Sequence, residues 1–100
     1  MPGKGGYIYI MSNKSRSVVY IGVTSNLCSR VYQHKLEIGS IFTNKYRCYD
    51  LIYYEFYPSI EEAILREKQL KKWKRTWKDE LITSMNPHLK DLFEDVTEMQ

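Results

Sequence analysis

Two short runs of strand-forming residues near the start of the chain constrain the fold more than any other feature. Residues 6–11 alternate aromatic and aliphatic side chains, and residues 18–23 are rich in β-branched and aromatic ones. Both compositions are typical of β-strands. The polar stretch between them predicts a hairpin with a four-residue loop at residues 13–16. The chain therefore begins with an antiparallel pair of strands.

The loop length determines the face of the sheet on which each side chain lies. With four loop residues, Ser12 pairs with Ser17 and Tyr9 pairs with Tyr20. Both tyrosines then lie on one face, because side chains alternate with period two along a strand. The opposite face carries aliphatic side chains throughout, and we expect it to pack in the core: Ile8, Ile10, Val19, Ile21 and Val23.

A helix, a loop and a third strand are expected after the hairpin. Residues 24–26 supply an N-cap for a helix over residues 27–38, and Gly39 ends this helix. Residues 40–47 are predicted to form a polar, basic loop. The tyrosine-rich run over residues 49–57 predicts the third strand, which stops at a proline.

Two further helices are expected in the second half of the chain. A Ser-Ile-Glu-Glu capping box at residues 59–62 predicts a helix that runs to about residue 73. Thr76 is a weaker cap for a helix over residues 77–85. The Asn-Pro pair at residues 86–87 ends that helix, since proline restrains the residue before it.

These elements predict one domain of the α/β (α+β) class. Their order, β-β-α-β-α-α, favours a small three-stranded antiparallel sheet flanked by helices. A chain of 100 residues forms a single domain. We expect its packed core over residues 6–93, a loose start at residues 1–5 and a frayed acidic tail at residues 94–100.

Composition indicates a location in the cytoplasm. No apolar run approaches the ~20 residues of a membrane span. The first residues lack the apolar stretch of a signal peptide. Cys28 and Cys48 are then expected as reduced thiols, because disulfides are rare in that compartment.

Positive charge is concentrated in one segment of the chain. Residues 66–78 hold seven Lys or Arg residues around a single acid, Glu67, whereas the last ten residues hold four acids and no base. A basic patch suggests a polyanionic partner such as nucleic acid. A solvated helix face explains the same charges equally well.

Two polar side chains interrupt the apolar stripe of the first predicted helix. Arg30 and His34 lie one turn apart on the stripe that Leu27, Val31 and Ile38 define. Polar groups on an inward face need partners, because unpaired buried charge is costly. Either they form a functional pair, or the arginine extends to solvent and the histidine is hydrogen-bonded in the core.

An acid interrupts the apolar stripe of the next helix. Glu67 lies within the stripe formed by Ile60, Ala63, Ile64 and Leu70. An exposed ion pair with Lys71 would explain it, at only ~0.3–0.5 kcal/mol. An inward carboxylate is also a hard oxygen ligand for Mg²⁺ (or Mn²⁺), and one carboxylate suffices because Mg²⁺ keeps several waters.

Together these groups could cleave a phosphodiester bond. Glu67 would hold the metal ion, and Arg30 would bind the non-bridging phosphate oxygens. Tyr9, Tyr20 or His34 would position or deprotonate the attacking water. The sequence leaves open which of these three is the base. A tyrosine of pKa ~10 is a poor base at neutral pH unless nearby positive charge favours the phenolate.

The same residues, in the same order, resemble the GIY-YIG nuclease superfamily. Residues 6–9, Gly-Tyr-Ile-Tyr, resemble the first motif, with the glycine one place early, and residues 20–22 match the Tyr-Ile-Gly of the second motif. Arg30 and Glu67 stand where the family has its arginine and its metal-binding glutamate. Asn86 matches a later motif. His34 occupies a position that is often tyrosine in the family.

The resemblance covers residues 6–93 and is similar to small stand-alone bacterial members. It implies a metal-dependent endonuclease that hydrolyses DNA, with a role in DNA repair or recombination. It also implies that both motif tyrosines lie near the scissile phosphate. Two alternatives remain, namely a nucleic-acid-binding module without cleavage, and a protein-interaction domain whose polar residues form a buried network.

The DNA is expected to contact a glycine, an amide and several cations. Gly22 would let the backbone approach closely. The other expected contacts are Lys45, Arg47, Lys68, Lys71, Lys72, Lys74, Arg75 and Asn86. Contacts to phosphate carry little base information, so we expect weak sequence selectivity or a protein partner that delivers the substrate. The oligomeric state is not predicted.

Overall fold

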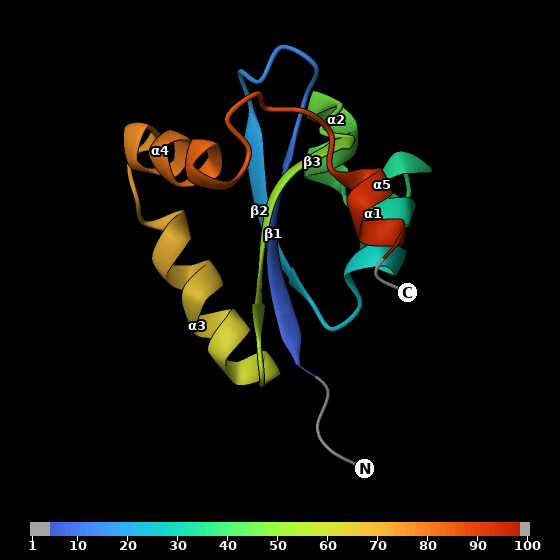
Figure 1. Ribbon diagram of the computed structural model, residues 1–100. Coiled ribbons are helices and arrows are strands. Elements are labelled where there is room, and N and C mark those ends of the chain that lie inside the picture. Colours follow the sequence, from blue (N-terminus) through green and yellow to red (C-terminus); the bar gives the residue numbers. More distant parts are fainter. Residues whose placement is uncertain (1–4, 99–100) are drawn as a thin grey trace.

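The computed structural model describes residues 5–98 and contains a three-stranded antiparallel sheet (Figure 1). Its strands are β1 (Gly6–Ser12), β2 (Val19–Thr24) and β3 (Asp50–Tyr57), and β1 lies between the other two. The predicted sheet is therefore confirmed. The expected loose start falls, apart from its last residue, outside the described residues, as do the final two residues of the expected tail.

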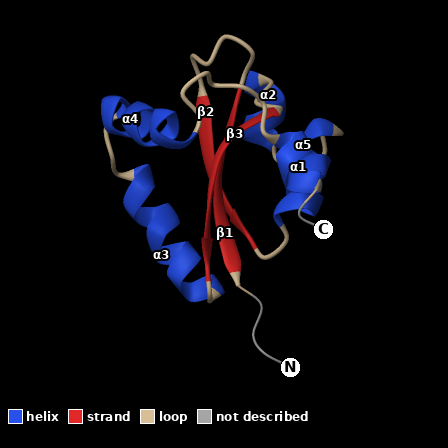
Figure 2. Ribbon diagram, in the orientation of Figure 1, coloured by secondary structure: helices blue, strands red, loops and turns tan. Residues whose placement is uncertain are grey.

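Five helices within the described residues cover the sheet on both faces (Figure 2). They are α1 (Leu27–Lys35), α2 (Ile41–Tyr46), α3 (Ile60–Lys71), α4 (Arg75–Met85) and α5 (Phe93–Thr97). The predicted order of elements holds, with the short helices α2 and α5 added. None of these helices is long and apolar enough to cross a membrane.

The hairpin between β1 and β2 has the predicted faces but not the predicted register. Tyr9 lies opposite Gly22, and Ser12 lies opposite Val19, so the expected Tyr9–Tyr20 and Ser12–Ser17 pairs are wrong. The connecting loop has six residues because the side chain of Asn13 closes it, accepting a hydrogen bond from the backbone N–H of Val18 at 3.0 Å. A shift of two residues preserves the alternation, so both tyrosines still share a face.

Each face of the sheet packs into its own apolar cluster. The predicted aliphatic face is confirmed: its side chains pack against α3 and α4, in a cluster that contains Ile8, Ile10, Ile21, Ala63, Leu70 and Ile82. The tyrosine face packs against α1 and α5, in a cluster that contains Tyr9, Met11, Leu27, Val31, Leu92 and Val96. The face expected to carry functional hydroxyls is thus also part of the core.

Helix α1 ends earlier than predicted, and a further helix follows it. Glu37 adopts the left-handed conformation with φ 64°, so Gly39 does not end the helix. Ser40 caps α2 by accepting a hydrogen bond from the N–H of Thr43 at 3.0 Å. The loop expected over residues 40–47 is therefore wrong, because the capping serine and its partner lie within it.

The other helix caps agree in part with the sequence. Ser59 accepts a hydrogen bond from the N–H of Glu62 at 3.2 Å, which confirms the predicted capping box. Helix α4 starts at Arg75 after Lys74, without a side-chain cap, so the cap expected at Thr76 is wrong. The side chain of Arg75 stabilises this start by donating to backbone carbonyls of the hairpin loop.

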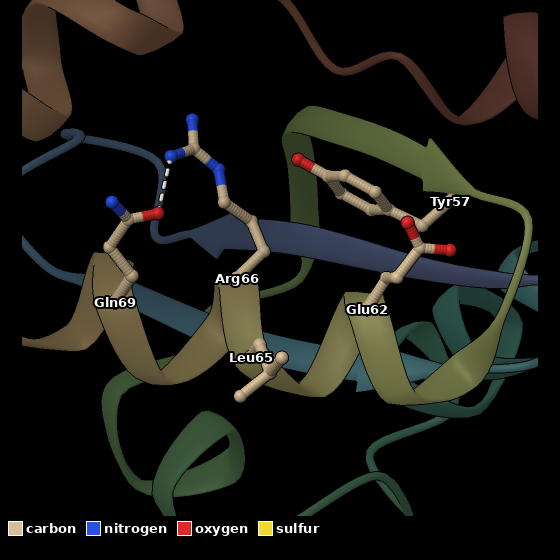
Figure 3. A pocket seen from close by; sticks show the side chains of 5 residues that line it. All are labelled: Tyr57, Glu62, Leu65, Arg66 and Gln69. Atoms are coloured by element: carbon tan, nitrogen blue, oxygen red, sulfur yellow. Dashed lines mark hydrogen bonds between the residues drawn. The ribbon is translucent and has the colours of Figure 1, made fainter.

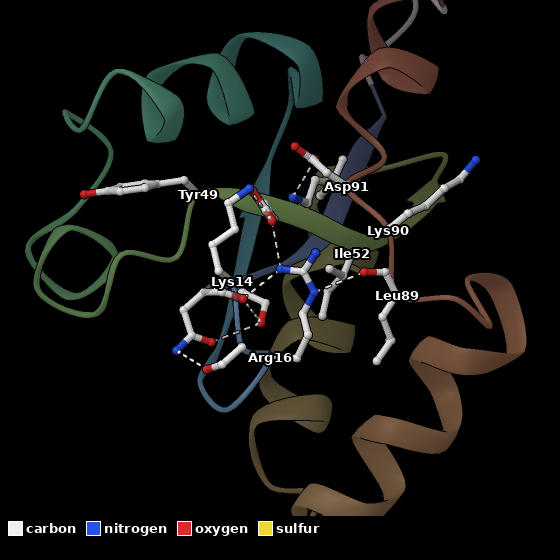
Figure 4. Close-up of polar contacts among 12 residues, drawn as sticks. Lys14, Arg16, Tyr49, Ile52, Leu89, Lys90 and Asp91 are labelled. Atoms are coloured by element: carbon white, nitrogen blue, oxygen red, sulfur yellow. Dashed lines mark hydrogen bonds and ion pairs between the residues drawn. The ribbon is translucent and has the colours of Figure 1, made fainter.

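The segment after α4 is fixed to the start of β3 (Figure 4). Asp91 accepts a hydrogen bond from the N–H of Leu51 at 3.0 Å and pairs with Lys35 of α1 at 2.5 Å. Arg16 of the hairpin loop donates to the carbonyl of Leu89 at 3.1 Å. These contacts bring α5 against α1, so residues 94–97, expected as a frayed tail, form a helix with Val96 buried.

Candidate active site

The two motif tyrosines lie side by side on one face of the hairpin. Their ring centroids are 6.4 Å apart, with Tyr9 buried and Tyr20 half-buried. A Cβ atom at Gly22 would lie 2.3 Å from the Tyr9 hydroxyl oxygen. The space above Gly22 is therefore occupied by the phenol, and not left open for the nucleic acid that the sequence predicted.

A buried histidine holds the Tyr9 hydroxyl in place. His34 Nε2 lies 3.0 Å from that hydroxyl, and His34 Nδ1 lies 3.1 Å from the Thr43 hydroxyl. The Thr43 hydroxyl donates to the carbonyl of Ser40 at 3.2 Å. We assign the histidine proton to Nδ1, which donates to Thr43, so Nε2 accepts the proton of Tyr9.

Burial and charge set the protonation of this pair. Burial raises the pKa of Tyr9 to about 12; Tyr20 adds to the rise, whereas the Arg30 guanidinium opposes it by its charge and a hydrogen bond. Burial also lowers the pKa of His34 to about 4, and the charge of Arg30 lowers it further. At neutral pH Tyr9 is therefore a phenol and His34 is neutral. The phenolate that the sequence expected Arg30 to favour does not form in the free protein.

Glu67 lies on α3, which covers the other face of the sheet. Helix α3 packs against β1 and β2, on the face opposite to α1 (Figure 1). The charge of Glu67 nevertheless acts on Tyr9, whose pKa it raises. Glu67 is half-buried, and its carboxylate pairs with Lys71 at 2.7 Å. The ion pair considered from the sequence is thus present, together with the inward position.

The donor set around Glu67 fits one kind of metal ion. Among residues 5–98, no group of three or more His, Cys, Asp or Glu side chains is placed to hold a metal. A single carboxylate fits an ion such as Mg²⁺, which takes its other oxygens from water and substrate phosphate.

A row of aromatic rings extends from Tyr20 onto α2. Phe42 lies 5.6 Å from Tyr20 and 4.7 Å from Tyr46, between ring centroids. Lys45 Nζ lies 5.3 Å from the Tyr46 centroid, and Arg47 is exposed at the end of α2. Sequence reasoning missed this row, although the i, i+4 spacing of its last two rings is a helix signal.

The cations predicted to bind nucleic acid do not form one free patch. Lys71 pairs with Glu67. Arg75 donates to the carbonyl of Ser17 at 2.9 Å and pairs with Asp79 at 2.8 Å, so it fixes the hairpin loop instead. The remaining predicted lysines of this segment are exposed: Lys68, Lys72 and Lys74.

Arg66 of the same segment is also used within the protein. Its Nε pairs with Glu55 at 2.9 Å, and its Nη1 donates to Gln69 at 2.8 Å (Figure 3). Together with Tyr57 and Glu62 it lines a surface hollow of about 520 Å³. Because one acid neutralises Arg66 and another lines the hollow, this hollow is a poor site for a phosphate.

Asn86, predicted to contact nucleic acid, has a structural role in the folded chain. A β-bulge leaves Ile52 unpaired with β1, and the buried amide of Asn86 donates to the Ile52 carbonyl at 3.1 Å. The same amide group donates to the carbonyl of Lys90 at 2.8 Å and accepts from its N–H at 3.2 Å. Both amide N–H donors of Asn86 are therefore used within the protein.

Comparison with known proteins yields one family and several relatives. The profile of the GIY-YIG catalytic domain matches residues 5–80. A UPF0213 protein of Clostridium perfringens is 37% identical over 78 residues, which are 78% of this chain and 83% of the relative. A UPF0213 protein of Staphylococcus haemolyticus is 34% identical over 76 residues, 76% of this chain and 92% of the relative. No solved structure gives a significant match.

Proposed function

Because the chain belongs to the GIY-YIG catalytic domain family, we propose that it is an endonuclease that hydrolyses phosphodiester bonds of DNA. The observation that carries this proposal is the contact of Tyr9, Tyr20 and His34 on one face of the sheet, with Tyr9 hydrogen-bonded to His34. Tyr20, Arg30 and Glu67 all shift the pKa of Tyr9. In this proposal the two hydroxyls, the Arg30 cation and the Glu67 anion act on one phosphate, as phosphoryl transfer requires.

Arg30 and Glu67 would bind the substrate phosphate from two sides. Arg30 is half-buried and always charged, so it is suited to hold two non-bridging oxygens. Glu67 would hold Mg²⁺ or Mn²⁺, which when bound supplies positive charge to the phosphate and the leaving oxygen. Lys71 would have to release the carboxylate, at little cost, because it is largely exposed.

The hydrogen bond between Tyr9 and His34 supplies a route for the proton of the attacking water. That proton would move to the Tyr9 oxygen while the phenol proton moves to Nε2 of His34. His34 alone is a weak acceptor, since burial and Arg30 lower its pKa. A phosphate bound to Arg30 would cancel that charge and make His34 more basic. In this proposal Tyr9 and His34 together act as the general base, and Tyr20 positions the attacking water.

Nicking of a supercoiled plasmid in Mg²⁺ tests the proposal. Glu67→Gln and Arg30→Lys should each abolish nicking, whereas Glu61→Gln, an exposed acid on the same helix, should leave it unchanged. Cleavage that survives Glu67→Gln would refute the metal-binding role. Salt-dependent DNA binding without any nicking by the unmodified chain would replace the nuclease with a binding module.

A further inference from the structure

A groove between α3 and α4 lies outside the site described above. It has a volume of about 550 Å³ and is lined by Leu65, Lys68, Gln69, Lys72, Trp73 and Trp77. A second hollow of about 450 Å³ shares its two tryptophans and continues along α4. The two indoles meet edge to face, with their centroids 6.0 Å apart and their planes at 89°.

Two large apolar side chains of this groove are exposed to water. Trp77 is 48% exposed and Leu65 is 68% exposed. Large apolar side chains that stay in water mark interaction sites, and tryptophan is the residue type most often central to them. A flat partner group could stack on Trp77 if the exposed side chain of Lys74, which lies over this ring, moves aside.

The charge around the groove selects a polyanion. Lys68 and Lys72 line it, and Lys74 Nζ lies 4.9 Å from the Trp77 ring centroid. Within residues 5–98 these three lysines make no ion pair, in contrast to Lys71. Glu80 is the acid that lines the adjoining hollow. Lysines beside stacked aromatic rings are the combination that binds nucleic-acid strands with unpaired bases.

The groove and Glu67 share helix α3 but lie on different sides of it. Lys68 follows Glu67 in the sequence, about 100° around the helix, and Trp73 lies just beyond the end of α3 at Lys71. A strand whose scissile phosphate lies at Glu67 would reach the tryptophans within a few nucleotides.

We propose that this tryptophan groove binds the part of the nucleic-acid strand that leaves the active site, with an unpaired base on Trp77 and phosphates on Lys68 and Lys72. The direction of the strand rests on the proposed nuclease function, whereas binding in the groove does not. An acidic peptide could use the lysines but would gain little from the indole face, so the nucleic acid is the better match.

Trp73 and Trp77 are the chain's two tryptophans, so intrinsic fluorescence reports directly on the groove. A single-stranded oligonucleotide, titrated in EDTA to prevent cleavage, should quench this fluorescence in a saturable manner. A duplex of the same sequence and poly-glutamate should quench it far less. Equal quenching by the duplex or by poly-glutamate would overturn the proposal, and so would the absence of quenching at concentrations where the oligonucleotide binds.

Substitutions separate the groove from the active site. Trp77→Ala should weaken oligonucleotide binding about tenfold or more, and Trp77→Phe should restore most of the affinity. Phe56→Ala, which removes a 57% exposed ring from β3, is the matched control and should have no effect. Far-UV circular dichroism checks that each variant is folded. Unchanged affinity in folded Trp77→Ala protein would refute the groove.

The same variants distinguish failure of the groove from failure of the nuclease proposal. Arg30→Lys and Glu67→Gln should stop nicking but keep the fluorescence quenching. If the unmodified chain shows quenching without nicking, the groove proposal stands and the nuclease proposal falls. If it nicks DNA while Trp77→Ala binds and nicks normally, the reverse holds.

Discussion

Replacement of Thr43 by valine is the sharpest test of the buried network around Tyr9. Valine has nearly the same shape as threonine, so the packing of α2 is retained. The change removes the hydroxyl 3.1 Å from His34 Nδ1 and leaves the cap of α2 intact, because Ser40 accepts there from the backbone N–H of residue 43. Only the side-chain hydrogen bonds of Thr43 are lost.

The cost of this change follows from burial. Thr43 and His34 are both fully buried, so water cannot replace the lost partner. A neutral imidazole has one donor and one acceptor, and Tyr9 can satisfy only one of them, whichever tautomer forms. One buried nitrogen is left unpaired, which costs about 1–3 kcal/mol of unfolding free energy. For a domain of this size, each kcal/mol lowers Tm by about 4–8 °C.

Two measurements check this prediction. Urea unfolding gives the loss of stability, and Thr43→Ser, which keeps the hydroxyl, should recover most of it. Long-range ¹H–¹⁵N NMR reports the tautomer of each histidine and should show a proton on Nδ1 of His34, with exposed His88 as the internal reference. Valine protein within about 0.5 kcal/mol of the parent, the usual range for surface substitutions, would refute the reasoning.

Three other changes test neighbouring parts of the argument. Gly22→Ala should lower the free energy of unfolding by about 1–3 kcal/mol and end nicking, because its Cβ would lie 2.3 Å from the Tyr9 hydroxyl. Urea unfolding and plasmid nicking should therefore both show a loss. Burial and Arg30 lower the pKa of His34 from its usual 6.5 to about 4, so the folded state favours the neutral imidazole. About 3 kcal/mol of unfolding free energy should therefore be present above pH 6.5 and be lost as the pH falls towards 4. In urea unfolding at several pH values, His34→Gln should flatten this pH dependence. Asn86→Ala should destabilise by about 1–3 kcal/mol without a separate loss of DNA affinity, since the Ile52 carbonyl loses its donor.

The parts of the fold that depend on alternation could be predicted from the sequence. Because side chains alternate along a strand, Tyr9 and Tyr20 lie on one face for any loop with an even number of residues. The predicted face is therefore correct although the predicted register is wrong by two residues. The register itself could not be predicted, because the side chain of Asn13 closes the loop from within. Statistics of short turns do not include such a contact.

Helix α2 illustrates the limit for short helices. Its six residues are too few for intrinsic propensity to decide, and a single pair of rings at i, i+4 spacing is a weak signal. The hydrogen bond between Thr43 and His34, nine residues earlier in the chain, is what ties it to the core. A tertiary contact of this kind leaves no periodic signal in the sequence.

For two of the predicted site residues the structure shows contacts that the sequence could not reveal. Counting charges could not show that Arg75 is used by the hairpin loop, because the carbonyl it binds belongs to Ser17, 58 residues away. The family motif indicated a function for Asn86, whereas the β-bulge at Ile52 accounts for it structurally. In both cases the hydrogen-bond partner lies far away in the sequence, so the role of the residue could not be predicted.

The attachment of the segment after α4 to β3 has a consequence for solubility. β3 is an outer strand of the sheet, and a bare outer strand is where a strand of another molecule can add. Asp91 and the N–H of Leu92 occupy both backbone groups of Leu51, and Asn86 occupies the carbonyl of Ile52. This segment thus prevents a strand of another molecule from pairing with β3 at these residues. A chain truncated before residue 86 would leave this edge of β3 unprotected and should aggregate more readily.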